Sequence, residues 1–252
     1  MNLPTHTIAL ATLLLFTAEA CAQISQLDVG LTSQREVIRA FSITAESEAA
    51  PRVLVIAGLD GPSPITEQLL SLAEHYSQRD AAGRGVNLLV IPIANPDADI
   101  LVFPPTGEAY QENSVSHALW RWTGVHAPDI IVIMGDDSAG FSEAASNLAV
   151  AGLGSIPVQT FAEISALTSQ LLEFSELRYS AAHSEVERRL ARSPRELAEQ
   201  LAGIYGREFS TPAYVPGMGM IGRLRLGQTA AIEEQLKNYL ADGEVVVSNA
   251  SL

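Results

Sequence analysis

The sequence contains a single cysteine, Cys21, among 252 residues. One cysteine cannot form a disulfide within the chain, so the fold must be stabilised by packing. Basic residues are also scarce, with 15 Lys and Arg against 29 Asp and Glu and a formal net charge of −14. This charge repels polyanions. The arginines Arg188, Arg189 and Arg192 stand among glutamates, which is typical of a solvated helix face. We therefore expect no nucleic-acid partner.

The remaining composition is that of a globular protein. Hydrophobic residues make up 47% of the chain and charged residues 17%. This balance excludes a disordered chain. The length allows one large domain, or one medium domain with an appendage.

The first residues have the pattern of a secretory signal peptide. Residues 8–17 form an uncharged apolar run, and small residues follow at Ala18, Ala20 and Ala22. A run of this length is too short to span a bilayer, which takes about 20 residues. The alternative is a buried first helix. We predict a signal peptide at 1–22, export to the periplasm or the cell exterior, and no transmembrane helix in the mature chain.

Cys21 lies at the predicted cleavage site. Cleavage after Ala20 would expose this cysteine for lipid attachment, whereas cleavage after Ala22 would remove it. Lipoprotein signals usually carry Leu three residues before the cysteine, where this chain has Ala18. The pattern favours plain secretion over a lipoprotein, with a mature chain that begins at Gln23.

Strands alternate with helices over 23–175. Continuous apolar runs at 53–57, 86–93 and 130–134 predict strands buried on both faces. Further strands are predicted at 37–44, on the sheet edge, and at 156–161, and helices at 65–78, 115–123 and 142–151. This order predicts an α/β domain with a mostly parallel sheet and helices on both faces. Sites in such sheets lie at the carboxyl ends of the strands.

A helical extension is predicted over 176–252. Ser193, Pro194 and Glu196 have the capping pattern that begins a helix, and a further helix is predicted at 229–241. The extension is either a docking appendage or the start of a larger domain.

The segments RVLVIAGLDGPSP, VNLLVIPIANPDA and APDIIVIMGDD, in this order, resemble the zinc carboxypeptidase family, especially its succinylglutamate desuccinylase-like branch. The resemblance covers 37–163 and implies a zinc carboxypeptidase-like fold. That family has a G-x-H-G-x-E motif after one strand, an N-P-D-G motif after the next, and a later zinc-binding His. Asn95 and Asp97 match the second motif, and the resemblance implies that they lie at the substrate site.

The zinc ligands that the resemblance implies are missing. Gly58 and Gly61 keep their places in the first motif, but Asp60 replaces the His and Ser63 the Glu. The third His falls at Gly135 or Asp136. Catalytic zinc needs three protein ligands and an open position for water. We therefore expect no zinc and no other cofactor.

Two further family features are also absent or displaced. The family's substrate-binding arginine has no counterpart in the loop segment 111–113. Its catalytic glutamate corresponds best to Glu163, which is one residue out of register, and such a shift turns a strand residue to the opposite face.

Carboxylates replace imidazoles at the expected metal position. Asp60, Asp136 and Asp137 each follow a predicted parallel strand, so they could converge and bind Ca²⁺ or Mg²⁺. The alternative is that these aspartates cap turns and helices.

A long loop at 95–113 leads into a helix that carries two tryptophans. Glu112, His117 and Trp120 are candidates for lining a ligand pocket there, because long loops often carry binding sites. Alternatively, Trp120 and Trp122 only pack the helix.

Two functional hypotheses follow. The first is an exported, non-catalytic domain that binds a small-molecule or peptide ligand, or a protein partner. The second is an active metal-dependent hydrolase of peptide or amide bonds, with a metal held by Asp60 together with Asp136 or Asp137, and with Glu163 as base. The sequence does not indicate an oligomeric state.

Overall fold

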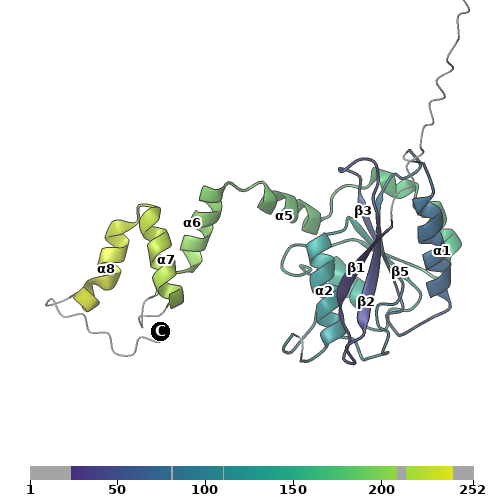
Figure 1. Ribbon diagram of the computed structural model, residues 1–252, viewed down its shortest axis with the longest axis horizontal. Helices are drawn as coiled ribbons and strands as arrows, with labels where there is room; N and C mark the ends of the chain where they lie inside the picture. The colour runs from purple at the N-terminus through teal and green to yellow at the C-terminus, as the bar shows by residue number, and fades with distance from the viewer. Residues whose placement is uncertain (1–23, 81, 110, 209–213, 241–252) are drawn as a thin grey trace, which may run out of the picture. The chain divides into compact units, whose positions relative to one another are not determined.

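The computed structural model describes residues 24–80, 82–109, 111–208 and 214–240. The chain divides between Val186 and Glu187 into an α/β unit and a helical unit, whereas the sequence places the boundary at 175 (Figure 1). The predicted signal peptide at 1–22, with Cys21, lies outside the described residues. Over the described part of the chain, no helix has the length and hydrophobicity needed to cross a membrane.

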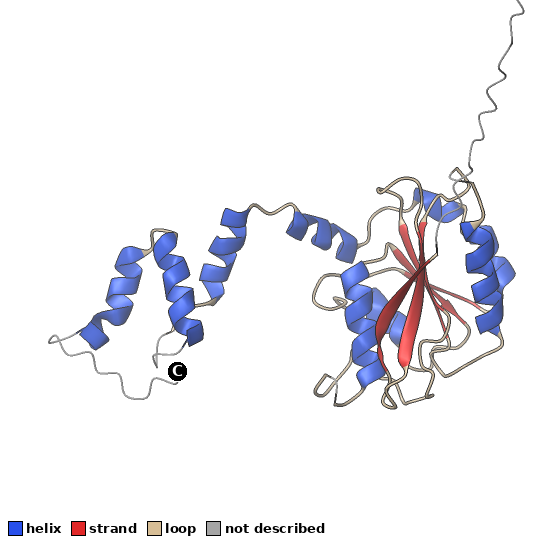
Figure 2. Ribbon diagram, viewed as in Figure 1, coloured by secondary structure: helices blue, strands red, loops and turns tan. Residues whose placement is uncertain are grey.

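The α/β unit contains a six-stranded sheet in the order β1-β2-β4-β3-β5-β6 (Figure 2). Its strands are β1 (Ser25–Leu31), β2 (Val37–Ile43), β3 (Arg52–Ala57), β4 (Asn87–Ile91), β5 (Ile130–Met134) and β6 (Val158–Phe161). The β3 strand pairs in parallel with β4 and β5, and β5 pairs in parallel with β6. At the other edge β1, β2 and β4 pair antiparallel. The predicted mostly parallel α/β fold is therefore confirmed.

The predicted edge position of β2 is wrong, because β1 lies outside it. No strand is predicted from the sequence over 25–31, so β1 was missed. Leu27, Val29 and Leu31 nevertheless alternate with Gln26 and Asp28, which is the period of a half-buried strand. A β-bulge interrupts the pairing with β2 between Asp28 and Gly30.

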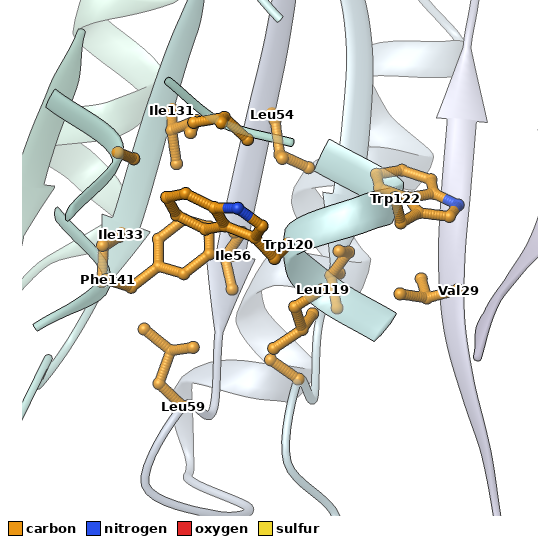
Figure 3. Packing of buried hydrophobic residues seen from close by; sticks show 14 of the residues in the cluster. Val29, Leu54, Ile56, Leu59, Leu119, Trp120, Trp122, Ile131, Ile133 and Phe141 are labelled. Atoms are coloured by element: carbon orange, nitrogen blue, oxygen red, sulfur yellow. The ribbon is translucent and has the colours of Figure 1, made fainter. Parts of the chain in front are cut away.

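Helices cover both faces of the sheet, as predicted. Alternate residues of β3 belong to different cores: Val53 and Val55 face one side, Leu54 and Ile56 the other. The first core is closed by α1 (Ile65–Ser77), α4 (Ile164–Gln170) and the 3₁₀ helix η1 (Glu173–Glu176). The second is closed by α2 (Ser114–His126) and α3 (Phe141–Asn147), and Figure 3 shows part of it.

A segment from beyond the last strand is anchored to the sheet at Asp129, directly before β5. The Asp129 carboxylate accepts hydrogen bonds from the Ser180 amide at 2.9 Å, the Arg52 amide at 2.9 Å and the His183 Nδ1 atom at 2.8 Å. Both Asp129 and His183 are buried. This contact fixes the start of α5 (Ala181–Leu190), the helix that contains the division of the chain into two units.

The helical unit contains α6 (Pro194–Ile204), α7 (Tyr214–Arg225) and α8 (Thr229–Leu240). The predicted capping box is confirmed, because the Ser193 side chain accepts a hydrogen bond from the Glu196 amide and the Glu196 carboxylate accepts one from the Ser193 amide. Ala202, Met220 and Ile232 are buried in this unit. The helical extension predicted from the sequence is therefore present.

Candidate functional site

The strands β1, β3, β4, β5 and β6 all end on the same side of the sheet. This includes β1, because it is antiparallel to β2, which is itself antiparallel to β4. The loops that follow these strand ends carry the candidate residues from the sequence. Two places have to be distinguished there: the turns after β3 and β5, and a groove beside β1 and α2.

The aspartates after β3 and β5 have hydrogen-bonding roles within the loops. Asp137 accepts hydrogen bonds from the Phe141 amide at 2.9 Å and the Ser142 amide at 2.8 Å, one to each carboxylate oxygen. Asp60 accepts a hydrogen bond from the Ser138 hydroxyl, so the two turns adjoin. Asp136 accepts one from the amide that follows it. Asp137 thus caps the start of α3, in agreement with the turn-cap alternative.

These residues do not fit a zinc site. Among the residues that the structure describes, no group of three or more His, Cys, Asp or Glu could hold a metal ion. Asp60 and Asp136 are exposed, and both oxygens of Asp137 are engaged by α3 amides. Imidazole, the donor that zinc prefers with thiolate, is missing at the motif positions.

Millimolar Ca²⁺ or Mg²⁺ is therefore expected to leave the melting temperature unchanged. A cation that bound only the folded state would stabilise it by about 2.7 kcal/mol at a hundredfold excess over its dissociation constant. Differential scanning fluorimetry of the protein and of Asp60→Ala measures this. A rise with either cation that disappears in Asp60→Ala would establish a carboxylate metal site.

Asn95 is fully buried and braces the loop after β4 against the loop after β3. Its Nδ2 atom donates to the carbonyls of Leu59 at 2.9 Å and Asp99 at 2.8 Å, and its Oδ1 atom accepts from the Asp99 amide at 3.0 Å. The side chain is therefore engaged within the protein. It positions Asp99, which lines the groove beside β1 and α2.

Asp97 holds the turn that joins β1 to β2. Its Oδ2 atom accepts hydrogen bonds from the Gln34 amide at 3.1 Å and the Ser33 hydroxyl at 3.3 Å. The pKa of Asp97 is lowered mainly by a hydrogen bond from the Thr32 side chain, and further by Gln34 and Ser33. Asp97 thus positions the turn after β1, whose residues Thr32, Ser33 and Arg35 also line this groove.

The pKa of Asp97 makes this turn sensitive to acid. A lowered pKa means that the stabilisation is fully present above the ordinary value of 3.8 and is lost as pH falls through the lower folded-state value. The Gln34 amide resonance should therefore titrate below pH 3.8, followed by NMR. Asp97→Asn should abolish this titration, and a Gln34 midpoint at or above the ordinary value would contradict the bracing role.

Glu163 is an exposed residue at the N-cap position of α4, with no side-chain capping hydrogen bond. It follows β6, the edge strand, and is not part of any described metal-binding group. The geometry therefore assigns Glu163 no partner for general-base chemistry within the described residues.

Trp120 is a core residue. Its ring centroid lies 6.1 Å from Phe141 and 6.1 Å from Phe103, and the two phenylalanines contact each other edge to face at 4.7 Å. Figure 3 shows Trp120 against Phe141, whereas Trp122 lies on the β1 side of the helix near Val29. Both indoles are buried, so they pack the helix rather than line a pocket.

A groove of about 900 Å³ lies beside β1 and α2. Its walls come from the β1 end and the following turn, the loop after β4, and one side of α2. His117 is in this wall, and its Nε2 atom lies 3.2 Å from the Thr106 carbonyl. Glu112 is exposed and packs over Gly107 instead. The polar side chains lining the groove include Thr32, Ser33, Arg35, Asp99, Gln111, Asn113, His117 and Arg121.

Sequence reasoning missed most of this groove. Arg35 belongs to the turn after β1, and it was not considered because β1 was not recognised. Arg121 lies four residues after His117, one helical turn along the same side of α2, and this spacing could have identified it.

No protein-family model matches the chain, and no curated protein matches it in sequence. Three solved structures are similar to part of it: a metallo-carboxypeptidase from Burkholderia cenocepacia (13% identity, TM-score 0.37, 47% of this chain and 38% of that one), an aspartoacylase family protein from Mesorhizobium loti (14%, 0.35, 45% and 40%), and a metallo-carboxypeptidase from Pseudomonas aeruginosa (15%, 0.36, 45% and 35%). The chain thus spans less than half the length of each. This likeness concerns the arrangement of strands and helices and establishes neither a family nor an activity.

Proposed function

We propose that the α/β unit is a non-catalytic binding domain that takes a small-molecule or peptide ligand in the groove between β1 and α2. The observation that carries the proposal is the bracing of the groove by buried or hydrogen-bonded side chains. Asn95 holds the Asp99 wall, and Asp97 holds the turn that carries Arg35. A preformed cavity with a few fixed polar groups is typical of a ligand site.

The groove also has the mixed chemistry that such sites use. Leu31 and Ile100 line it with 52% and 88% of their surfaces exposed, and Arg35 and Arg121 contribute cationic groups. Ligand sites commonly combine apolar walls with a small number of charged or polar groups. The carboxylates of Asp60, Asp136 and Asp137 are not among the lining residues, so the proposed binding does not require them.

The test separates binding from hydrolysis. A fragment set rich in carboxylates and short peptides is titrated into ¹⁵N-labelled protein, and we expect amide shifts centred on His117 and Arg121. Arg121→Gln should weaken them, whereas Arg195→Gln, which removes the same charge from the helical unit, should not. N-acylated amino acids and peptides incubated with the protein and added Zn²⁺ should remain intact. Zinc-dependent cleavage would refute the non-catalytic proposal.

We also propose that the protein is exported without a lipid anchor, because of the apolar run and the A-x-A spacing before Gln23. Expression in a bacterial host with its natural leader should yield a mature chain whose first residue is Gln23, as read by N-terminal sequencing. Retention of Met1, or a lipid on Cys21, would contradict this.

A further inference from the structure

We propose that the ligand is an extended peptide that adds to the outer edge of β1 as a further strand, with its carboxylate near Arg35 and Arg121. This inference rests on the proposed binding function and names the ligand class for the same groove.

The β1 strand lies at the edge of the sheet. It is the first strand in the sheet order and runs over Ser25–Leu31, and among the described residues it pairs only with β2. The main-chain N–H and C=O groups on its other side point away from the sheet. A row of such groups is the template that extended peptides use when they bind to a sheet edge.

The groove lies at the carboxyl end of this strand, where Gly30 and Leu31 line it. Ser114, His117 and Arg121 line it at a helical spacing, so one side of α2 faces it. Gly30 lets this helix approach closely, because a Cβ atom there would lie 2.5 Å from the Ala118 Cβ atom. The groove therefore lies between a strand end and a helix, and Leu31 and Ile100 offer apolar contacts to alternate side chains of a peptide.

The charged side chains in the groove favour a ligand with a carboxylate group. Arg35 and Arg121 line the groove with Asp99 as the acidic residue, although the chain as a whole carries a formal charge of −14. Guanidinium groups form paired hydrogen bonds with carboxylates. Arg35 also has a φ of 67°, a left-handed backbone that favours glycine. A strained arginine at the groove is consistent with a functional side chain.

The bulge in β1 favours a peptide over a second copy of the chain. Val29 is the extra residue between Asp28 and Gly30. Bulges twist an edge and discourage its pairing with another flat sheet edge. A short flexible peptide can follow the bend, and pairing of the β1 edges of two copies is the competing outcome.

The experiment selects binders from a displayed library of random ten-residue peptides with free C-termini. We expect selected peptides to shift and protect the β1 amides over 25–31 in NMR and hydrogen exchange. Each peptide is then resynthesised with N-methyl groups on every second residue, in both phases. Only alternate residues of an added strand hydrogen-bond to β1. One phase should therefore lose about tenfold or more in affinity while the other keeps most of it.

Variants test whether the carboxylate of the peptide binds near Arg35. Arg35→Gly should leave the melting temperature unchanged or raised, because glycine tolerates the left-handed backbone, yet weaken binding several-fold. Amidation of the peptide C-terminus should have a similar effect, and Arg195→Gln should have none.

The outcomes separate the two proposals. Carboxylate fragments that shift the groove amides while no peptide is selected would overturn strand addition and leave the proposed function intact. Equal loss in both N-methylated phases, or a dimer in solution with protected β1 amides and no ligand, would also overturn strand addition. If neither fragments nor peptides bind, both proposals fail.

Discussion

Asp129→Ala is expected to lower the free energy of unfolding of the α/β unit by about 3–5 kcal/mol, because buried donors that lose their acceptor cost about 1–3 kcal/mol each. The carboxylate of Asp129 is almost fully buried and is shared by the Arg52 amide, the Ser180 amide and the His183 ring. Alanine would leave these donors inside the protein without an acceptor. Urea unfolding followed by circular dichroism measures the loss.

The matched control for this prediction is Asp28→Ala. Asp28 forms an ion pair with Arg39 at 3.5 Å, but the two side chains are 70% and 49% exposed. An exposed pair of this kind contributes about 0–1 kcal/mol. If Asp129→Ala unfolds at the same urea concentration as Asp28→Ala, the anchoring of the segment before α5 contributes little to stability.

Trp120→Ala is expected to lower the free energy of unfolding by about 3–5 kcal/mol, as large-to-small changes at buried aromatic residues do. The indole packs against Phe103 and Phe141, so its removal leaves a cavity and breaks two aromatic contacts. Trp120→Phe should recover part of this stability. Chemical unfolding of the three proteins gives the comparison.

The control is His117→Ala, one turn earlier on the same helix and only partly buried. We expect it to change stability by less than about 1 kcal/mol and to weaken ligand binding. Trp120→Phe, in contrast, should lower stability and leave ligand binding unchanged. If Trp120→Phe abolished binding while His117→Ala did not, the indole would belong to the ligand site after all.

The strands and helices that pack the core could be predicted from the sequence because their patterns are local. Runs such as 53–57 and 130–134 are continuous and β-branched, and this is how strands covered on both faces differ from amphipathic ones. The start of α6 was equally local, since Ser193 and Glu196 satisfy each other's backbone amides within one turn.

The roles of the motif residues could not be predicted from the sequence. Asn95 and Asp97 were assigned to a substrate site, but their side chains hold Asp99 and the turn at Gln34, which is 63 residues away from Asp97 in the chain. Asp137 was a candidate metal ligand and caps α3 instead. A side-chain oxygen can accept a hydrogen bond from an amide or a hydroxyl, or it can coordinate a cation, and only the folded arrangement decides which of these is near.

The sequence by itself determined the fold class, because the local periodicity of apolar residues sets the order of strands and helices. Only the tertiary structure decided where the groove lies. The groove is lined by the turn after β1 and by one side of α2. These two segments lie together because β1 is the edge strand and because Gly30, which has no side chain, allows α2 to pack closely against it. Contacts between residues so far apart along the chain depend on strand order, which no local pattern encodes.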